Sequence, residues 1–399
     1  MSAIKRFLFR VFRKNETEIH ELNYLFWECT WRCNLSCRHC GSDCKAESNV
    51  KDMPFADFLH ALEPLEQRYP RDTVIIAITG GEPLLRTDLA DCGRTLRQHG
   101  FRWGIVTNGM LYDEARHREL VAAGMSSITV SLDGLEETHN WLRQHPQSFQ
   151  RALRALRLIV NEPRLIYDVV TCVHGRNLKE LPQLKELLIS NGVQHWRLFT
   201  IAPIGRAAGD RELMLSRAQV EEMLQFIAAT RKEGRIDLKF SCEAYTGKYE
   251  EEVRDSYFFC RAGINIGSVL LNGDISACPN IARSFKQGNI YEDNLLDVWD
   301  NCFEMMRNRD WMRCGPADEA PWKGRRDRPA AEPDRGPSLG ADRHGLRDLD
   351  LGHRSAPDKA RAAYYGLFHR RPVGLLQDDR GDRQRRSFNR SILRSRGHR

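Results

Sequence analysis

Apolar runs alternate with amphipathic stretches through the first half of the chain. Six runs have the apolar, β-branched composition of strands, at 24–29, 73–79, 102–107, 127–132, 165–173 and 195–201. Five stretches between them repeat apolar residues at steps of three and four, as helices do, at 55–65, 89–96, 115–123, 149–160 and 181–189. Strands that are apolar on both faces and separated by crossover helices form parallel sheets. The pattern predicts an α/β fold, a partial (β/α)6 TIM-like barrel, with an open doubly wound sheet as the alternative.

A helical pattern precedes this barrel. Residues 1–21 form a basic leader in which apolar residues recur at helical spacing between Lys and Arg, namely Ile4, Phe7, Leu8, Val11 and Phe12. We expect a helix that packs on the barrel, because one short helix without a lipid anchor binds a membrane surface weakly. Contact with anionic lipid is the alternative.

The alternation ends after residue 235. A hairpin is predicted further on, where Asn272 and Gly273 stand between two apolar runs. We therefore divide the chain into the leader at 1–21, the barrel at 22–235, a smaller cysteine-containing domain at 236–315 and a tail at 316–399.

Positive charge is concentrated in the tail. The chain carries a net charge of +7, and residues 316–399 contain 18 Arg and 2 Lys against 12 acidic residues, so the body is nearly neutral. A disordered segment, which cannot bury enough apolar surface to fold, is one interpretation. An arm that binds nucleic acid is a second. A frame-shifted reading of the gene is a third, favoured by the excess of Arg over Lys and by the absence of cysteine after Cys314.

The composition indicates the cellular compartment in which the protein is expected. Twelve cysteines in 399 residues are too few for a secreted disulfide scaffold, and no apolar run reaches the length of a membrane span. The first residues are too interrupted by charge for a signal peptide. We expect a protein of the reducing cytoplasm.

Three cysteines follow the first predicted strand with CxxxCxxC spacing: Cys33, Cys37 and Cys40. Thiolates are soft ligands that hold iron–sulfur clusters, and three of them on one loop would leave one iron of a 4Fe–4S cluster open to a small molecule. Zinc is the alternative metal, because a CxxC pair suits it. The candidates for a fourth zinc ligand are Cys44, Cys29 and His39.

Glycine-rich and polar residues follow the other strands, as Gly80-Gly-Glu-Pro83, Asn108-Gly109, Ser131-Leu-Asp133-Gly and Pro203-Ile-Gly-Arg206. The carboxyl ends of parallel strands share one edge, so these residues should face the cysteine loop. Gly80 and Gly81 allow close backbone approach, and Glu82, extended before a proline, could receive an ammonium group. Arg143 could clamp a carboxylate with help from Ser131. The edge therefore suits an amino-acid headgroup that chelates a cluster.

CxxxCxxC after the first strand and GGEP after the second together resemble the radical S-adenosylmethionine (SAM) enzymes over residues 22–235. By this resemblance Cys33, Cys37 and Cys40 ligate a 4Fe–4S cluster, and Gly80–Pro83 contact the methionine amino group. Ser131 and Arg143 match the pair that holds the methionine carboxylate in members with a SPASM domain. Asn108 and Gly205 are implied as ribose or adenine neighbours. The longer string at 29–44 resembles members associated with a lipoprotein partner.

The resemblance implies an enzyme that reductively cleaves SAM to a 5′-deoxyadenosyl radical, which abstracts hydrogen from a substrate. Well-known SPASM members modify peptides or proteins, so a peptide or protein side chain is the expected substrate. A small-molecule cofactor precursor is the alternative, as in tetrapyrrole-modifying relatives. Flavodoxin or ferredoxin is implied as the reducing partner, with no specific nucleic acid. The rival from another class is a non-catalytic zinc protein with a nucleic-acid-binding tail.

The second predicted domain carries four further cysteines: Cys242, Cys260, Cys278 and Cys314, not counting Cys302. The spacing Cys-x12-Gly-x4-Cys from Cys260 to Cys278 resembles the opening of a SPASM domain, which holds auxiliary iron–sulfur clusters. The dense CxxC-x5-C run of such domains is missing. These four residues could complete at most one auxiliary cluster; unmetallated thiols beside a hairpin are the alternative.

Overall fold

The computed structural model describes residues 3–241 and 244–309. The predictions for the tail, for Cys242 and for Cys314 lie outside these residues. Within them, ten strands form one sheet in the order β10-β9-β8-β1-β2-β3-β4-β5-β6-β7. The strands from β1 to β7 are parallel, β8 joins them parallel to β1, and β9 and β10 are antiparallel to their neighbours.

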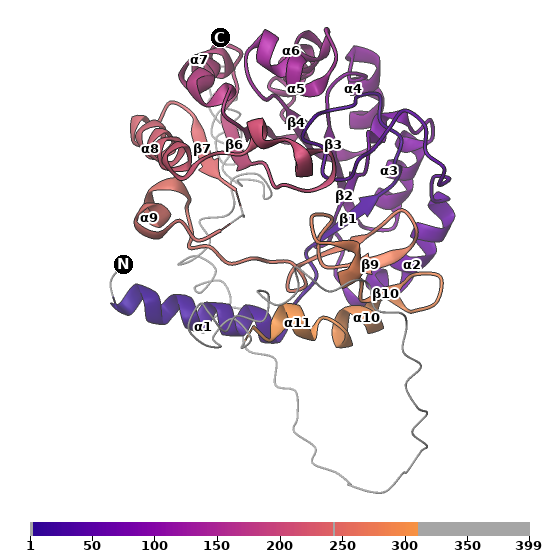
Figure 1. Cartoon of the computed structure of the whole chain (residues 1–399). Coiled ribbons are helices and arrows are strands. Elements are labelled where there is room, and N and C mark those ends of the chain that lie inside the picture. Colours follow the sequence, from indigo (N-terminus) through magenta and orange to yellow (C-terminus); the bar gives the residue numbers. More distant parts are fainter. Residues whose placement is uncertain (1–2, 242–243, 310–399) are drawn as a thin grey trace, which may run out of the picture.

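The strands are β1 Tyr24–Glu28, β2 Ile75–Thr79, β3 Arg102–Thr107, β4 Met125–Ser131, β5 Ile166–Val173, β6 His195–Thr200, β7 Asp237–Phe240, β8 Ile266–Val269, β9 Asp274–Ser276 and β10 Gly288–Asn289. The helices are α1 Ala3–Ile19, α2 Phe55–Arg68, α3 Leu89–Gln98, α4 Glu114–Ala122, α5 Glu136–Arg143, α6 Ser148–Ile159, α7 Leu181–Ser190, α8 Arg217–Glu233, α9 Glu250–Val253, α10 Leu295–Asn301 and α11 Glu304–Arg307. Helices α3 to α8 lie outside the curved row of strands (Figure 1). The predicted partial barrel is confirmed.

Large aromatic side chains fasten this helical layer to the sheet. The Trp27 ring of β1 stacks on Phe58 of α2, with centroids 4.5 Å apart, and Trp196 of β6 meets Phe226 of α8 at 6.0 Å. Trp103 of β3 lies against Gly93 of α3, where a Cβ atom would come within 2.1 Å of the ring. Side chains alternate along a strand between the two faces of the sheet. The residues directly before and after each of these tryptophans therefore face the concave side.

Strand β7 lies beyond the six predicted strands. Its sequence, Asp-Leu-Lys-Phe, alternates charged and apolar residues and lacks the continuous apolar run of a parallel strand buried on both faces. It lies at one end of the sheet, where Leu238 and Phe240 are buried and Asp237 and Lys239 are half-buried. The sheet is thus continuous across residue 235, and the division into domains there stays a prediction.

Helix α1 packs against the segment that leads into β8. Phe12 is 5% exposed and clusters with Phe259 and Ile264, while Arg261 forms an ion pair with Glu16 at 2.5 Å. The outer face of α1 leaves Ile4 and Phe7 exposed. In the described part of the chain, no helix combines the length and apolar character needed to cross a bilayer.

Replacing Phe12 with Ala should loosen α1 from the barrel. Removing a buried phenylalanine side chain costs about 3 kcal/mol of unfolding free energy. Phe7→Ala on the same helix, where the side chain is 57% exposed, should cost less than about 0.5 kcal/mol. Urea unfolding of the two variants measures the difference, and equal midpoints would contradict the packing of α1.

Candidate functional site

The predicted site residues come together at the carboxyl edge of the sheet. We use the name cluster loop for residues 29–45, which follow β1 and contain CxxxCxxC. Beside it lie the turn Pro83–Leu85 after β2, Asn108 after β3 and Ser131 at the end of β4. The segment that follows β6, residues 201–216, covers another side of the loop. Five separate βα connections therefore meet at one place, as the strand order requires.

The cluster loop holds its three predicted ligands close to polar hydrogen-bond donors. Asn108 Nδ2 lies 3.9 Å from Cys33 Sγ, and Arg143 Nη1 lies 3.8 Å from Cys37 Sγ. A hydrogen bond from the Cys44 thiol lowers the pKa of Cys40, whereas burial raises the pKa of Cys33 to about 11. The loop thus offers soft sulfur ligands with donors beside two of them.

Spacing of the thiols separates a cluster from a single ion. Thiolates around one zinc ion lie about 3.8 Å apart, given Zn–S bonds of about 2.3 Å. Within the described residues, Cys33, Cys37 and Cys40 do not form a group whose sulfur atoms all lie within 4.8 Å of one another. The three thiols are therefore not gathered around one point as the ligands of a single ion would be.

The GGEP turn is laid against the start of the cluster loop. A Cβ atom at Gly80, whose φ is +131°, would lie 2.2 Å from Thr30 O, and one at Gly81 would lie 2.1 Å from Arg32 O. Gly81 N donates to Thr30 O at 2.7 Å, and Glu82 N donates to Arg32 O at 2.9 Å. These glycines are therefore required by close approach to the protein's own backbone; their contact with a ligand stays a prediction.

Glu82 is fully buried and its carboxylate is held in place. Its oxygens accept hydrogen bonds from Leu84 N at 3.1 Å, Thr107 Oγ1 at 2.8 Å and Asn108 N at 2.8 Å. Burial raises the pKa of Glu82 despite these donors. Its predicted role toward an ammonium group stays a prediction, and the network gives the carboxylate one fixed position.

Arg143 forms a buried ion pair with Asp133. Arg143 Nη2 lies 2.5 Å from Asp133 Oδ2, and Cys172 N donates to Asp133 Oδ1 at 2.9 Å. Burial alone would raise the pKa of Asp133, but the Arg143 guanidinium holds it near 2. The predicted pairing of Arg143 and Ser131 on a carboxylate stays a prediction. Asp133 is a site residue that sequence reasoning missed, although it stands in the quoted turn after β4.

His39, Asp133 and Cys172 place their ligand atoms within 4.8 Å of one another, the only such group of three or more in the described residues. It is not a convincing cation site, because Arg143 already neutralises Asp133. His39 Nδ1 is buried and has no hydrogen-bond partner among the described residues. Burial lowers the pKa of His39 to about 3. The His39 imidazole is therefore neutral, lies beside Asp133 and Cys172, and has one ring nitrogen that makes no hydrogen bond within the described residues.

The remaining predicted residues divide between two regions. Gly205, at φ +57°, approaches the cluster loop so closely that a Cβ atom would lie 2.4 Å from Cys40 O. Its predicted place beside ribose or adenine stays a prediction. Cys260 and Cys278 are half-buried near the hairpin of β8 and β9. The auxiliary ligand set that joins them to Cys242 and Cys314 stays a prediction as well.

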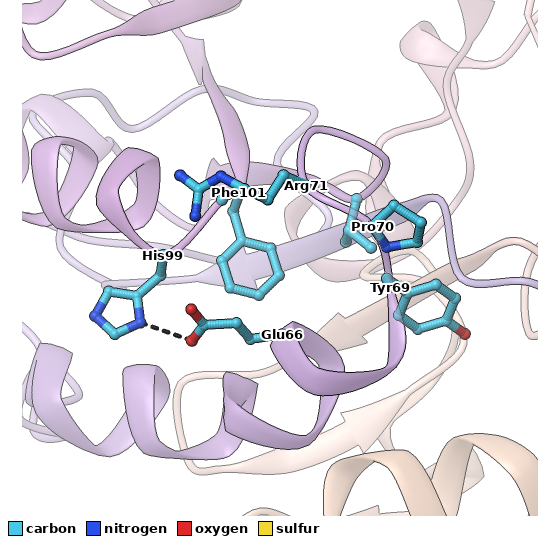
Figure 2. Close-up of a pocket in the computed structure, with 8 residues that line it drawn as sticks. Glu66, Tyr69, Pro70, Arg71, His99 and Phe101 are labelled. Atoms are coloured by element: carbon cyan, nitrogen blue, oxygen red, sulfur yellow. Dashed lines mark hydrogen bonds and ion pairs between the residues drawn. The ribbon is translucent and has the colours of Figure 1, made fainter.

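A small pocket of about 140 Å³ lies at the other end of the strands. Figure 2 shows the His99 imidazole directed at the Glu66 carboxylate, with Phe101 beside them. The His99 Nδ1 to Glu66 Oε2 distance is 2.8 Å, which ties α2 to the end of α3. The pocket is remote in the fold from the carboxyl edge and contributes nothing to the site.

Comparison with known proteins agrees with this geometry. The family model described as the Radical SAM superfamily matches residues 27–188, which include the cluster loop and the GGEP turn. The AdoMet-dependent heme synthase of Methanosarcina barkeri is 27% identical over 307 residues, covering 71% of this chain and 84% of that protein. The PqqA peptide cyclase of Gluconobacter oxydans is 24% identical over 293 residues, covering 72% and 80%.

Among solved structures, Streptococcus suis SuiB bound to its precursor peptide SuiA superposes with a TM-score of 0.59. The two chains are 18% identical, and the match covers 76% of this chain and 73% of SuiB. At this identity the likeness shows the fold alone.

Neutralising Asp133 should destabilise the protein strongly. Asp133→Asn leaves the buried Arg143 charge uncompensated, which costs about 3 to 5 kcal/mol of unfolding free energy. The matched control is Asp91→Asn, because Asp91 pairs with Arg94 at a position where its side chain is 77% exposed. That change should cost no more than about 0.5 kcal/mol. Denaturant unfolding at pH 7 tests both, and equal losses would contradict a buried pair.

Stability should fall as the pH drops from 7 to 5. Burial lowers the pKa of His139 to about 3 and of His174 to about 4, so the unfolded chain, with histidine near 6.5, binds more protons in this range. Each histidine should contribute about 2 kcal/mol to the loss. His139→Asn should flatten the pH profile, whereas His60→Asn, at an exposed position, should leave it unchanged. An unaltered profile in His139→Asn would refute this assignment.

Proposed function

The chain is a radical SAM enzyme, and on this premise we propose that it modifies the side chain of a peptide or protein. Cys33, Cys37 and Cys40 would hold the 4Fe–4S cluster. The SAM contacts would come from Gly80–Pro83, Asn108, Ser131, Arg143 and Gly205. Bound together, the cluster and SAM supply reductive cleavage of the sulfonium and removal of a hydrogen atom from the substrate.

The chain's own residues would bind and orient SAM. Arg143 is aligned by Asp133, so its guanidinium is already fixed when a carboxylate arrives. Glu82 is fixed by three donors and offers a carboxylate in a buried setting. Two ends of an amino-acid headgroup would thus meet groups of opposite charge in prearranged positions, which reduces the ordering cost of binding.

Two arginine side chains stack on Trp141 beside the cluster loop. The Trp141 ring of α5 lies between the guanidinium groups of Arg38 and Arg176, whose central carbons are 4.0 and 4.3 Å from the ring centroid. Arg38 also pairs with Asp210 at 2.6 Å. These contacts join the cluster loop to α5 and to the segment after β6, and would limit the access of water from that side.

We infer the substrate class from the concave face of the sheet, where positive and negative side chains are paired. Ser131 pairs in register with Val170, and Val170 with Arg197, so Arg197 lies at the level of the predicted carboxylate contact. Arg197 Nε lies 2.5 Å from Asp168 Oδ2, and its side chain remains 39% exposed. Thr129 Oγ1 donates to the same carboxylate at 2.6 Å.

The next strand repeats the arrangement. Lys239 Nζ of β7 lies 3.0 Å from Asp237 Oδ2 and 2.7 Å from Asp255 Oδ2. A tetrapyrrole with several carboxylates would favour a surplus of cations on this face, whereas a peptide segment of mixed polarity suits paired charges. The similarity to the PqqA peptide cyclase supports the same class.

A tetrapyrrole is the second candidate substrate. It is favoured by the similarity to three AdoMet-dependent heme synthases and to the Fe-coproporphyrin III synthase of Methanosarcina barkeri, at 27 to 28% identity. We further propose a cytoplasmic setting, electron supply by flavodoxin or ferredoxin, and one auxiliary iron–sulfur cluster on Cys242, Cys260, Cys278 and Cys314. An iron count of the reconstituted full chain distinguishes one cluster from two.

Anaerobic reconstitution with iron and sulfide tests the enzyme. With SAM and dithionite, the full chain should form 5′-deoxyadenosine and methionine. Cys37→Ala should abolish both products, because the cluster loses a ligand. Cys302→Ala, at an exposed cysteine outside the cluster loop, should leave them unchanged. Cleavage that survives Cys37→Ala would refute the ligand assignment, and a protein that takes up zinc alone would support the non-catalytic alternative.

Deuterium transfer tests the substrate class. Proteins and peptides from cells grown in D2O carry deuterium at their carbon atoms, and a hydrogen taken from them should appear as deuterium in 5′-deoxyadenosine by mass spectrometry. Deuterated Fe-coproporphyrin III provides the comparison. Label from the polymer fraction supports the proposal, whereas label from the tetrapyrrole alone would replace it with the second candidate.

A further inference from the structure

Arg206 grips the backbone of the cluster loop. Its Nε donates to Cys37 O at 2.7 Å, its Nη1 donates to Cys44 O at 2.7 Å, and its backbone N donates to Cys40 O at 3.0 Å. The same Nη1 lies 3.0 Å from Asp43 Oδ1. One residue of the segment after β6 thus binds the carbonyls of two predicted cluster ligands and of the cysteine beyond them.

This grip matters because the cluster loop has little regular structure of its own. Between β1 and α2 the chain forms turns, bends and one isolated bridge, Arg32 to Lys45. Few internal hydrogen bonds fix it; Cys40 N to Cys37 O, at 3.2 Å, is one of them. A backbone without ladder bonds must have its polar groups satisfied by neighbours, which then decide its shape.

Arg206 reaches the loop because the residue before it is glycine. Gly205 lies at φ +57°, and a Cβ atom there would come within 2.4 Å of both Cys40 O and Gly41 O. A second arginine contact runs in the opposite direction: Arg38 of the cluster loop donates to Asp210, in the segment after β6, at 2.6 and 3.0 Å. The two segments are therefore joined by reciprocal arginine contacts.

We propose that Arg206 is a positioning residue for the cluster, holding the backbone of Cys37 and Cys40 in ligating geometry and favouring the reduced cluster through its charge. The proposal rests on the radical SAM assignment and not on the substrate class. A cation near an iron–sulfur cluster stabilises the more negative, reduced state, so it makes reduction easier. The planar guanidinium group of Arg206 holds two carbonyl groups at once, which the single ammonium group of a lysine cannot do in the same geometry.

The experiment uses the reconstituted full chain. It separates the effect of the two guanidinium hydrogen bonds of Arg206 from the effect of its positive charge. Arg206→Gln removes both, so iron should be released to a chelator on the order of tenfold faster, as for the loss of one or two hydrogen bonds, and the midpoint potential should become more negative. Arg206→Lys keeps the charge and should show faster release at a nearly unchanged midpoint. Arg211→Gln, in the same segment, should match the wild type in both.

Release rates and EPR-monitored redox titrations require neither substrate nor turnover. Wild-type values in Arg206→Gln would overturn the proposal, and faster release at an unchanged midpoint would overturn its electrostatic part. If Arg206→Gln does not fold, Arg206→Lys decides, because wild-type release in that variant also overturns it. A wild-type chain that takes up no cluster would instead refute the radical SAM site itself.

Discussion

The cluster loop satisfies only part of its own backbone hydrogen bonding, and the contacts that complete it organise the carboxyl edge of the sheet. The carbonyls of Thr30 and Arg32 are met by the GGEP turn, and those further along by Arg206. Each contact requires close approach, which explains why glycine stands at positions 80, 81 and 205. The motif residues are therefore structural partners of the loop as well as candidates for ligand contact.

Charged side chains near this edge are stabilised in two ways. Arg143 pairs with Asp133, Arg197 with Asp168, and Lys239 with two aspartates, whereas the buried Glu82 is held by three neutral donors. Pairing limits the desolvation cost that an isolated charge would carry. It also leaves the concave face close to neutral, which is why the shape of the face and the positions of its dipoles, more than its net charge, would select what binds there.

Much of the fold was predictable because apolar runs and helical spacing are local signals, and the six predicted strands all match observed ones within two residues at each end. Strand β7 was not, since its charged and apolar residues alternate as in a half-exposed strand. The cysteines and GGEP were found from spacing. Asp133 and Arg206 were quoted in turns but given no role, because their partners, Arg143 and the cluster-loop carbonyls, become neighbours only when the strands are in register.

The pairing of β8 with β1 sets an order of events during synthesis. The strand that leads into the cysteine loop, Tyr24–Glu28, lies between β2 and Ile266–Val269, so one of its edges stays open in the nascent chain until the later strand leaves the ribosome. At synthesis rates of about 5 to 20 residues per second, roughly 10 to 50 seconds separate the two. Through that interval the strand before the thiols has a neighbour on one side only, so iron and sulfide delivered early would meet a loop on an unfinished sheet.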